Sequence, residues 1–440
     1  MDVVLLSRIQ FAVAAGFHFI FPPLTFGVTL VILVLETLFL KSGEEIYKTI
    51  SSFLIKILGL IFVVGVATGI VLEFSFGTNW AQYSRLVGDI FGAPLAAEGI
   101  FAFFLESVFL GVLLFGRNRV SRRVYWLSAF LVFFGSHLSG FWIIIANSWM
   151  QTPAGFVMEG GRAVLTDFYA AVFNPSTVIR YLHTMLAGWI TGTLFLAGIA
   201  AWYLLNKRHE AVSRIIMKIS LVIFIFSALA QFVSGHSSAV QVTRTQPEKM
   251  AAFEALWNTV DGAPLSLIGI PVESEQKTYL EISIPKLLSL LAYFDPNARV
   301  LGLNEFKPDE RPPVLLPYMS YHVMIALGSL FALLAAVSTL LLFRGTAYTS
   351  KWFLVSMIAA IPLPHLANEF GWIAAEVGRQ PWAVYRVLRT ADAVSVVVPA
   401  WQVLFSLIMF SLIYLLLFAV FVMILLKIIK KGPGAAAEGY

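Results

Sequence analysis

Nine long apolar runs constrain the fold of this 440-residue chain more than any other feature. Each is close to, or longer than, the roughly 20 residues with which an α-helix crosses a hydrocarbon core. They occupy residues 11–40, 53–76, 94–116, 124–148, 178–205, 215–234, 320–343, 351–377 and 400–427. The chain is 59% hydrophobic and 12% charged, too little polar surface to cover a water-soluble domain of this length. We therefore predict an all-α integral membrane protein, a bundle of nine transmembrane helices in a lipid bilayer.

The basic residues lie at the ends of these runs, so the net charge of +5 does not indicate a nucleic-acid partner. Those that share one predicted side are Lys41, Lys48, Arg117, Arg119, Arg122, Arg123, Lys207, Arg208, Arg214, Lys218, Arg344, Lys351, Lys427, Lys430 and Lys431. The positive-inside rule makes that side cytoplasmic. The C-terminus is then cytoplasmic, and the N-terminus lies outside.

The predicted helices divide the chain into three parts. Residues 1–237 hold helices one to six, residues 238–318 form one long extracytoplasmic loop, and residues 319–440 hold the last three helices and a short cytoplasmic tail. Within the proline-rich loop only PEKMAAFEALWNT, residues 247–259, has a helical pattern. Residues 149–177, rich in glycine and proline, suit an irregular lid. The N-terminus lacks the features of a cleaved signal peptide, so we expect the first helix to be retained.

The chain contains no cysteine. It can therefore form no disulfide, no thiolate-held iron–sulfur cluster and no covalently attached c-type haem. Any redox centre must be held by His, Met, Glu, Asp or Tyr side chains, or be bound without covalent attachment.

Several ionisable residues interrupt the apolar runs, where each costs about 2.5–3.5 kcal/mol and so indicates function. They are His18, Lys56, Glu73, Glu98, Glu106, His183, His365, Glu369 and Glu376. On a regular helix Glu98 and Glu106 would lie about 12 Å apart along the axis and within about 80° of one face, which suits a proton relay. Haem iron accepts His, alone or with Met. The alternative for each histidine is a hydrogen bond to a backbone carbonyl, and for Met324 it is core packing.

Five segments resemble subunit I of the cytochrome bd family of quinol oxidases. They are SRIQFAVAAGFHFIFPPLT (7–25), GVATGIVLEFSFGTNW (65–80), VGDIFGAPLAAEGIFAFFLES (87–107), FWIIIANSWMQTPAG (141–155) and GWIAAEVGRQPW (371–382). The resemblance extends over nearly the whole chain. It implies a nine-helix, haem-bearing subunit of a prokaryotic terminal oxidase in the cell membrane.

The resemblance also implies three haems and their iron ligands. His183 and Met324 match the axial ligands of a low-spin haem b. His18 and Glu376 match ligands of the active-site pair, a high-spin haem b and a haem d, which is a chlorin, or a further haem b in its place. Which of the two binds which haem is left open.

The resemblance assigns the remaining polar positions to proton and substrate routes. Glu98 and Glu106 match acidic positions on proton routes, and Lys56 and Glu73 match polar positions in the second helix. Lys249 and Glu254 match the residues of the quinol site, which makes residues 238–318 a quinol-binding loop. In the GRQPW signature Arg379 is expected to bind haem propionates and Trp382 to pack at the membrane interface. The alternative for Arg379 is a lipid phosphate.

The sequence departs from the family pattern at His322, which stands where an arginine usually precedes the ligand methionine by two residues. Positions 322 and 324 are about 200° apart on a helix, so both cannot face one iron. We expect His322 to take the place of the arginine near a propionate. The alternative is that it displaces Met324 as ligand.

The expected function is oxidation of quinol at the outer face and reduction of O2 to water with cytoplasmic protons, which builds a membrane potential without pumping. The expected partners are subunit II of the oxidase and, as a further candidate, a small single-span subunit. A haem b quinol dehydrogenase that passes electrons elsewhere is one alternative. A proton-coupled transporter is another, although the internal repeats of such proteins are not found in this sequence.

Overall fold

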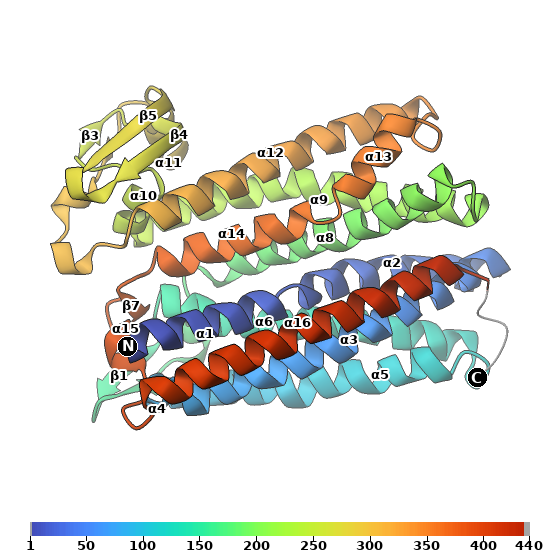
Figure 1. Ribbon diagram of the computed structural model, residues 1–440, viewed down its shortest axis with the longest axis horizontal. Coiled ribbons are helices and arrows are strands. Elements are labelled where there is room, and N and C mark those ends of the chain that lie inside the picture. Colours follow the sequence, from blue (N-terminus) through green and yellow to red (C-terminus); the bar gives the residue numbers. More distant parts are fainter. Residues whose placement is uncertain (1, 435–440) are drawn as a thin grey trace.

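The computed structural model describes residues 2–434. Eight helical segments in this range are long and apolar enough to cross a membrane, and they run side by side along the long axis of the molecule (Figure 1). Their bounds are Val3–Ser42, Glu45–Thr78, Arg122–Gln151, Thr177–Leu205, Glu210–Thr245, Leu315–Phe343, Lys351–Val377 and Ala400–Lys431. The prediction of an all-α membrane bundle is therefore confirmed.

The predicted count of nine membrane helices is not confirmed, because the run at 94–116 is interrupted. It consists of α4 (Ala81–Ala97), a π-helix (Glu98–Phe103) and α5 (Phe104–Phe115), of which none alone reaches a membrane-spanning length. A π-turn also changes the angular offset between residues on either side of it. The value of about 80° between Glu98 and Glu106 assumed an uninterrupted α-helix, and it is wrong here.

Two of the eight segments are also broken, and proline explains both breaks. The first consists of α1 (Val3–His18) and α2 (Phe21–Ser42), with Pro22 and Pro23 at the start of α2. The seventh consists of α13 (Lys351–Ala359) and α14 (Leu363–Val377), with Pro362 between them. Proline lacks the amide hydrogen that a continuous helix needs and clashes with the preceding turn.

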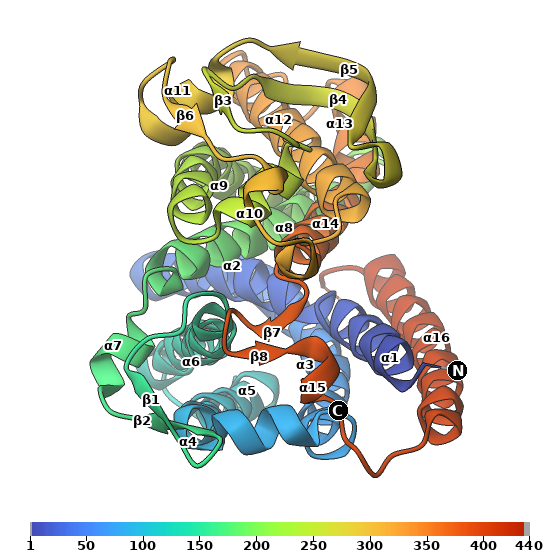
Figure 2. The same ribbon diagram turned by 90° about the vertical axis from the view of Figure 1, so that its left-hand side faces the viewer.

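Helix α2 joins two groups of helices. It packs against α8 (Thr177–Leu205) on one side and against α3 (Glu45–Thr78) and α6 (Arg122–Gln151) on the other. In the end-on view of Figure 2, α8, α9 (Glu210–Thr245), α12 (Leu315–Phe343) and α14 lie above α2, whereas α3, α5 and α6 lie below it. The last helix, α16 (Ala400–Lys431), packs against α1 and α3.

Short elements gather at one end of the bundle (Figures 1 and 2). Four antiparallel strand pairs are present: β1 (Phe156–Glu159) with β2 (Arg162–Leu165), β3 (Val260–Asp261) with β6 (Arg299–Val300), β4 (Leu265–Val272) with β5 (Lys277–Ile284), and β7 (Trp382–Val384) with β8 (Leu388–Arg389). The short helices are α7 (Phe168–Val172), α10 (Pro247–Phe253), α11 (Leu287–Tyr293) and α15 (Thr390–Ala393).

These elements correct three sequence predictions. The segment 149–177 contains a β-hairpin, not only an irregular lid, and the helix expected over 247–259 ends at Phe253. The boundaries at 237 and 319 fall inside helices, because α9 continues to Thr245 and α12 begins at Leu315. Hydropathy marks where a helix leaves an apolar environment, whereas the helix itself ends where its backbone hydrogen bonds end.

Candidate functional site

His18, the last residue of α1, is held by a hydroxyl group of α3. Its Nδ1 lies 2.9 Å from Thr68 Oγ1, and that hydroxyl donates its own proton to the carbonyl of Val64 at 2.9 Å. Because a hydroxyl has a single proton, Thr68 accepts from His18, so Nδ1 carries the hydrogen and Nε2 carries the lone pair. A Cβ atom on Gly69 would lie only 3.2 Å from His18 Cε1. The glycine therefore permits this close contact between the ring and α3.

His183 on α8 has the same arrangement. Its Nδ1 lies 3.0 Å from Ser234 Oγ of α9, and that hydroxyl donates to the carbonyl of Gln231 at 3.0 Å. Nε2 then carries the lone pair, and the side-chain amide nitrogen of Gln231 lies 3.1 Å from Nε2 and 3.2 Å from Nδ1. A histidine that binds a metal or haem iron is commonly fixed through Nδ1–H in this way, and iron at Nε2 of His183 would take the place of the Gln231 amide.

Met324 on α12 packs against α14. A Cβ atom on Gly371 would lie 3.0 Å from Met324 Sδ, so the absence of a side chain there makes room for the thioether. Helix α9 packs against both α8 and α12, and α14 also contacts both. Met324 and His183 thus belong to one group of four helices (Figure 2).

His322 contacts two backbone carbonyl groups. Its Nδ1 lies 2.8 Å from the carbonyl of Tyr318, and its Nε2 lies 2.9 Å from the carbonyl of Ser266 in β4. Both nitrogens are therefore engaged by backbone oxygens. The ring instead links the β4–β5 hairpin to α12.

Glu376 lies on the last turn of α14 among buried cations. Arg379 Nη2 is 2.6 Å from Glu376 Oε2, and Arg180 Nη2 is 3.7 Å from Glu376 Oε1. The side-chain amides of Asn147 and Gln151 donate to Oε1 at 3.1 and 3.0 Å. The sequence predicted an arginine turned toward propionates and a glutamate turned toward iron, whereas here the two side chains form an ion pair.

This cluster carries more positive than negative charge. Two guanidinium groups, those of Arg180 and Arg379, face the single carboxylate of Glu376. Among the buried donors that lack a hydrogen-bond partner within residues 2–434 are Arg379 Nη1, Arg180 Nε and Trp382 Nε1. Buried donors without partners are rare in native proteins. Their presence beside surplus positive charge indicates a site for an anionic group such as a carboxylate.

Lys249 lies on the buried side of α10. Its Nζ donates to Gln151 Oε1 at 2.5 Å and to Gln246 Oε1 at 2.7 Å. Burial lowers the pKa of Lys249 well below its usual range. A Cβ atom on Gly378 would lie 3.1 Å from Lys249 Cγ and 3.0 Å from the ring of Phe253. Gly378 therefore lets α10 pack directly against the end of α14.

Glu254 follows α10 and faces the hairpin. The amide of Ser266 donates to Glu254 Oε2 at 3.0 Å, and Oε1 is buried without a partner within the described residues. Burial raises the pKa of Glu254 to about 8. Within residues 2–434 no hydrogen bond or ion pair joins Glu254 to Lys249.

The acidic residues of the bundle interior lie near one another around the π-helix. Glu98, at the start of the π-helix, accepts a hydrogen bond from Ser139 Oγ at 2.6 Å. Glu106 lies on α5 and Glu73 on α3, a helix that packs against both α4 and α5. Glu106 is buried, Lys56 of α3 is partly exposed, and Glu73 of α3 is exposed. The structure thus brings three carboxyl groups from different segments together.

Sequence reasoning missed the groups that position the predicted residues: Thr68, Ser234, Asn147, Gln151, Arg180 and Gln246. A signal was available for Arg180, which lies three residues before His183 and so on the same face of α8. Hydroxyl and amide side chains occur throughout the membrane helices, so their contacts with particular ligands could not be found from spacing alone.

The fold and the site define a class: a helical membrane protein whose interior presents imidazole lone pairs beside a site for an anion, as membrane cytochromes do. The family model for cytochrome bd terminal oxidase subunit I matches residues 6–433, and the chain belongs to that family. It is similar to cytochrome bd ubiquinol oxidase subunit 1 of Bacillus subtilis strain 168, with 39% identity over 98% of this chain and 94% of the relative.

Two further comparisons agree. The chain is 34% identical to cytochrome bd-II ubiquinol oxidase subunit 1 of Escherichia coli strain K12, over 99% of this chain and 98% of that one. The solved structure of bd oxidase from Geobacillus thermodenitrificans matches with a TM-score of 0.92 at 31% identity, covering 98% of this chain and 99% of the other. Family membership makes this chain a subunit of a terminal oxidase, an enzyme whose cofactor is haem.

The residues present fit haem. The Nε2 lone pairs of His18 and His183 suit iron, and Gly371 makes room for the sulfur of Met324. The donors of Arg379, Arg180 and Trp382 that lack partners suit propionate carboxylates. No group of three or more His, Asp or Glu side chains within residues 2–434 is arranged to hold a bare metal ion.

Proposed function

We propose that the chain is the haem-bearing subunit of a quinol:O2 oxidoreductase that oxidises quinol at the outer membrane face and reduces O2 to water with cytoplasmic protons. Two curated relatives are named ubiquinol oxidases, and a third, 32% identical, is named a putative menaquinol oxidase. The enzyme is a quinol oxidase. The observation that carries the proposal is the matched arrangement of His18 and His183, each fixed through Nδ1 by a hydroxyl group so that Nε2 can bind iron.

In this proposal His183 and Met324 hold a low-spin haem b. His18 and Glu376 serve a high-spin haem b and a haem d, or a further haem b in its place. Bound haem would supply electron transfer and the reduction of oxygen. For Glu376 to reach an iron, its carboxylate has to leave Arg379, which then becomes free for a propionate. Asn147 and Gln151 would keep Glu376 oriented through Oε1.

Quinol is proposed to bind at α10, where Glu254 and Lys249 are the groups that can hold or release a proton. The carboxyl of Glu254 is mostly protonated at neutral pH, because burial raises its pKa to about 8. It accepts a proton from quinol only when ionised. Lys249 holds Gln151, which also binds Glu376, so α10 is connected to the haem side by hydrogen bonds.

Protons for oxygen reduction are proposed to come from the cytoplasm through Glu106 and Glu98, with Glu73 and Lys56 as further polar positions. Quinol protons would leave on the outer side, so charge would separate across the membrane without a pumping step. This requires the N-terminus outside and the C-terminus in the cytoplasm of a prokaryotic cell. The proposed partners are subunit II and a small single-span subunit.

The reduced-minus-oxidised visible spectrum of the purified enzyme, recorded with and without carbon monoxide, tests this proposal. We expect a far-red band that shifts with carbon monoxide if a chlorin is bound, or haem b bands that shift if all three haems are b. His18→Ala and Glu376→Ala should each abolish oxygen uptake, and His183→Ala should remove the low-spin signal. Oxygen uptake that survives both of the first two substitutions would exclude this oxidase site.

A further inference from the structure

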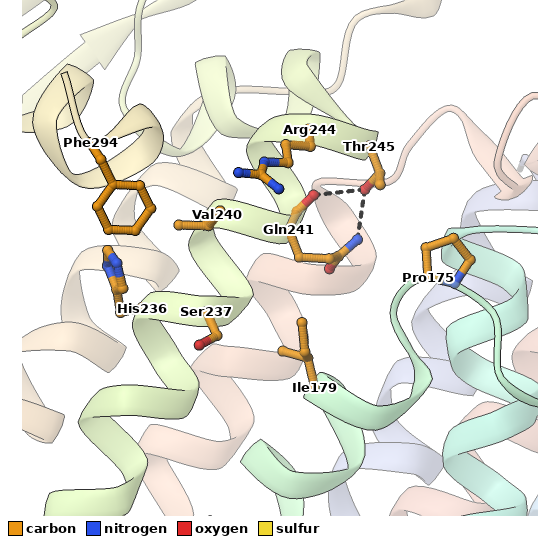
Figure 3. Close-up of a pocket in the computed structure, with 9 residues that line it drawn as sticks. All are labelled: Pro175, Ile179, His236, Ser237, Val240, Gln241, Arg244, Thr245 and Phe294. Carbon is orange, nitrogen blue, oxygen red and sulfur yellow. Dashed lines mark hydrogen bonds between the residues drawn. The ribbon is translucent and has the colours of Figure 1, made fainter.

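A cavity opens at the surface where α8 begins and α9 ends. Its volume is about 390 Å³, and its lining comes from three segments (Figure 3). The last turns of α9 contribute His236, Gln241 and Arg244, the start of α8 contributes Ile179, and Phe294 closes the cavity from the end of α11. None of the functional residues proposed above lines it.

The polar side of the cavity is positive. Arg244 and His236 line it together with uncharged donors, and no carboxylate is among the lining residues. Within residues 2–434 Arg244 forms no ion pair and is exposed. The first turn of α8 begins at Thr177, two residues after Pro175 of the lining, and adds the positive end of a helix dipole. The cavity is therefore complementary to an anion.

An apolar surface continues from the cavity along the same helices. On α9 the side chains of Phe226, Leu229 and Val233 are 60%, 61% and 70% exposed. Along the helix, Phe226, Leu229, Val233, Val240 and Arg244 follow one another at intervals of three, four, seven and four residues. These positions share one helix face. On α8 Val178 and Leu182 are likewise exposed. A molecule with an anionic head and long apolar chains would contact both surfaces at once.

We propose that this cavity binds the headgroup of an anionic phospholipid, with the phosphate at Arg244 and the acyl chains along the exposed faces of α8 and α9. The guanidinium would donate two hydrogen bonds to phosphate oxygens. Gln241 and Thr245, which hydrogen-bond to each other at 2.7 Å, offer further polar contacts (Figure 3). The positive charge of the cavity favours an anionic phosphate over quinol. The head of quinol is neutral, and its oxidation requires a group that accepts a proton, whereas Arg244 is a cation.

The test uses the whole purified enzyme, stripped of lipid in detergent and titrated with phosphatidylglycerol while native mass spectrometry counts bound lipids. We expect Arg244→Gln to weaken the tightest phosphatidylglycerol site about tenfold or more, the effect of losing a charged hydrogen-bonding partner. Arg244→Lys should retain part of the affinity. Arg162→Gln, at an exposed arginine in the β1–β2 hairpin, is the matched control and should change nothing.

Three results would overturn the proposal. One is equal affinity of the Arg244→Gln variant and the unchanged enzyme for phosphatidylglycerol. Another is equal binding of phosphatidylcholine, which would show that the headgroup charge does not matter. The third is competitive displacement of the lipid by a quinone analogue, which would assign the cavity to quinol. An unchanged haem spectrum in each variant establishes that the fold is retained.

Discussion

At the scale of single residues, two hydroxyl groups determine which nitrogen each ligand histidine presents. Thr68 and Ser234 each give their proton to a backbone carbonyl of their own helix and so can only accept from an imidazole. A serine or threonine that bonds to its own helix is common. Here the same local bond has a second consequence, because it sets the tautomer of a histidine on a neighbouring helix.

We expect Thr68→Val and Ser234→Ala to weaken haem binding at His18 and His183 respectively. Loss of a group that orients a metal ligand typically costs about 10–100-fold in affinity. The measurement is haem content per protein and the rate of haem transfer to a haem-free acceptor protein. Thr68→Ser keeps the hydroxyl and is the matched control. Unchanged haem release in both variants would show that these hydroxyls do not hold the ligands.

Glu254 provides a residue-scale prediction about pH. Its raised pKa of about 8, against 4.5 for an ordinary glutamate, means that the folded loop binds this proton more tightly than the unfolded chain does. Its contribution to stability is therefore full below about pH 4.5 and is lost as pH rises through about 8. Quinol oxidation has the opposite dependence, since only the ionised carboxylate accepts a proton.

We expect the initial rate of quinol oxidation to rise about tenfold per pH unit below pH 8 and to level off above it. Glu254→Gln should give a low rate without this rise. Glu159→Gln, at an exposed position of β1, is the control and should keep the profile of the unchanged enzyme. A rate that does not vary between pH 6 and pH 9, of which about two units lie on the acid side of this pKa, would contradict the role of Glu254.

At the scale of elements, His322 joins the β4–β5 hairpin to α12. Its Nε2 contact to Ser266 is reinforced by the bond between Ser266 Oγ and the hydroxyl of Tyr318 at 2.7 Å. The amide of Ser266 in turn binds Glu254. The histidine therefore positions Glu254 through the hairpin, without contact to the carboxylate itself.

We expect His322→Ala to free the hairpin from α12, which should raise the KM for quinol several-fold and speed amide hydrogen exchange in β4, with less effect on kcat. The reduced haem spectrum should stay unchanged. His322→Gln, which can still donate to Ser266, should recover part of the KM. Ser329→Ala on the same helix is the control, because its hydroxyl bonds only within α12. A changed low-spin haem spectrum with an unaltered KM would place His322 at the haem instead.

At the scale of the whole molecule, the two helix groups meet where α2 crosses α8 without intervening side chains. A Cβ atom on Gly27 would lie 2.6 Å from the Cα of Gly192, and one on Gly192 would lie 2.5 Å from the Cα of Gly27. Because these neighbours are backbone atoms, neither can move aside without shifting a helix. Small residues at such crossings let membrane helices approach closely.

We expect Gly27→Ala and Gly192→Ala each to destabilise the enzyme by roughly 1–3 kcal/mol, the usual cost of overpacking. The measurement is the temperature at which haem absorbance is lost on heating. Gly111→Ala in α5 is the control, since a Cβ atom there would meet no atom within 4 Å. Equal thermal stability of all three variants would show that this crossing does not hold the two groups together.

The sequence by itself determined the membrane class, the helical segments and, through its family resemblance, the residues expected at the haems and at the quinol loop. Apolar length is a local property, and a run of about 20 apolar residues has few alternatives to a membrane helix. Proline explains two of the three breaks, those between α1 and α2 and between α13 and α14, although the runs 11–40 and 351–377 were each predicted as one uninterrupted helix.

Only the tertiary structure decided how those residues are held. The tautomer of His18 depends on Thr68, 50 residues away, and the ion pair of Glu376 depends partly on Arg180, almost 200 residues away in the chain. The strands of the loop and the bonds of His322 to Tyr318 and Ser266 likewise arise from packing between distant segments. A hydrogen bond requires its two groups at about 3 Å with the right direction, and the order of residues along a chain does not specify that geometry.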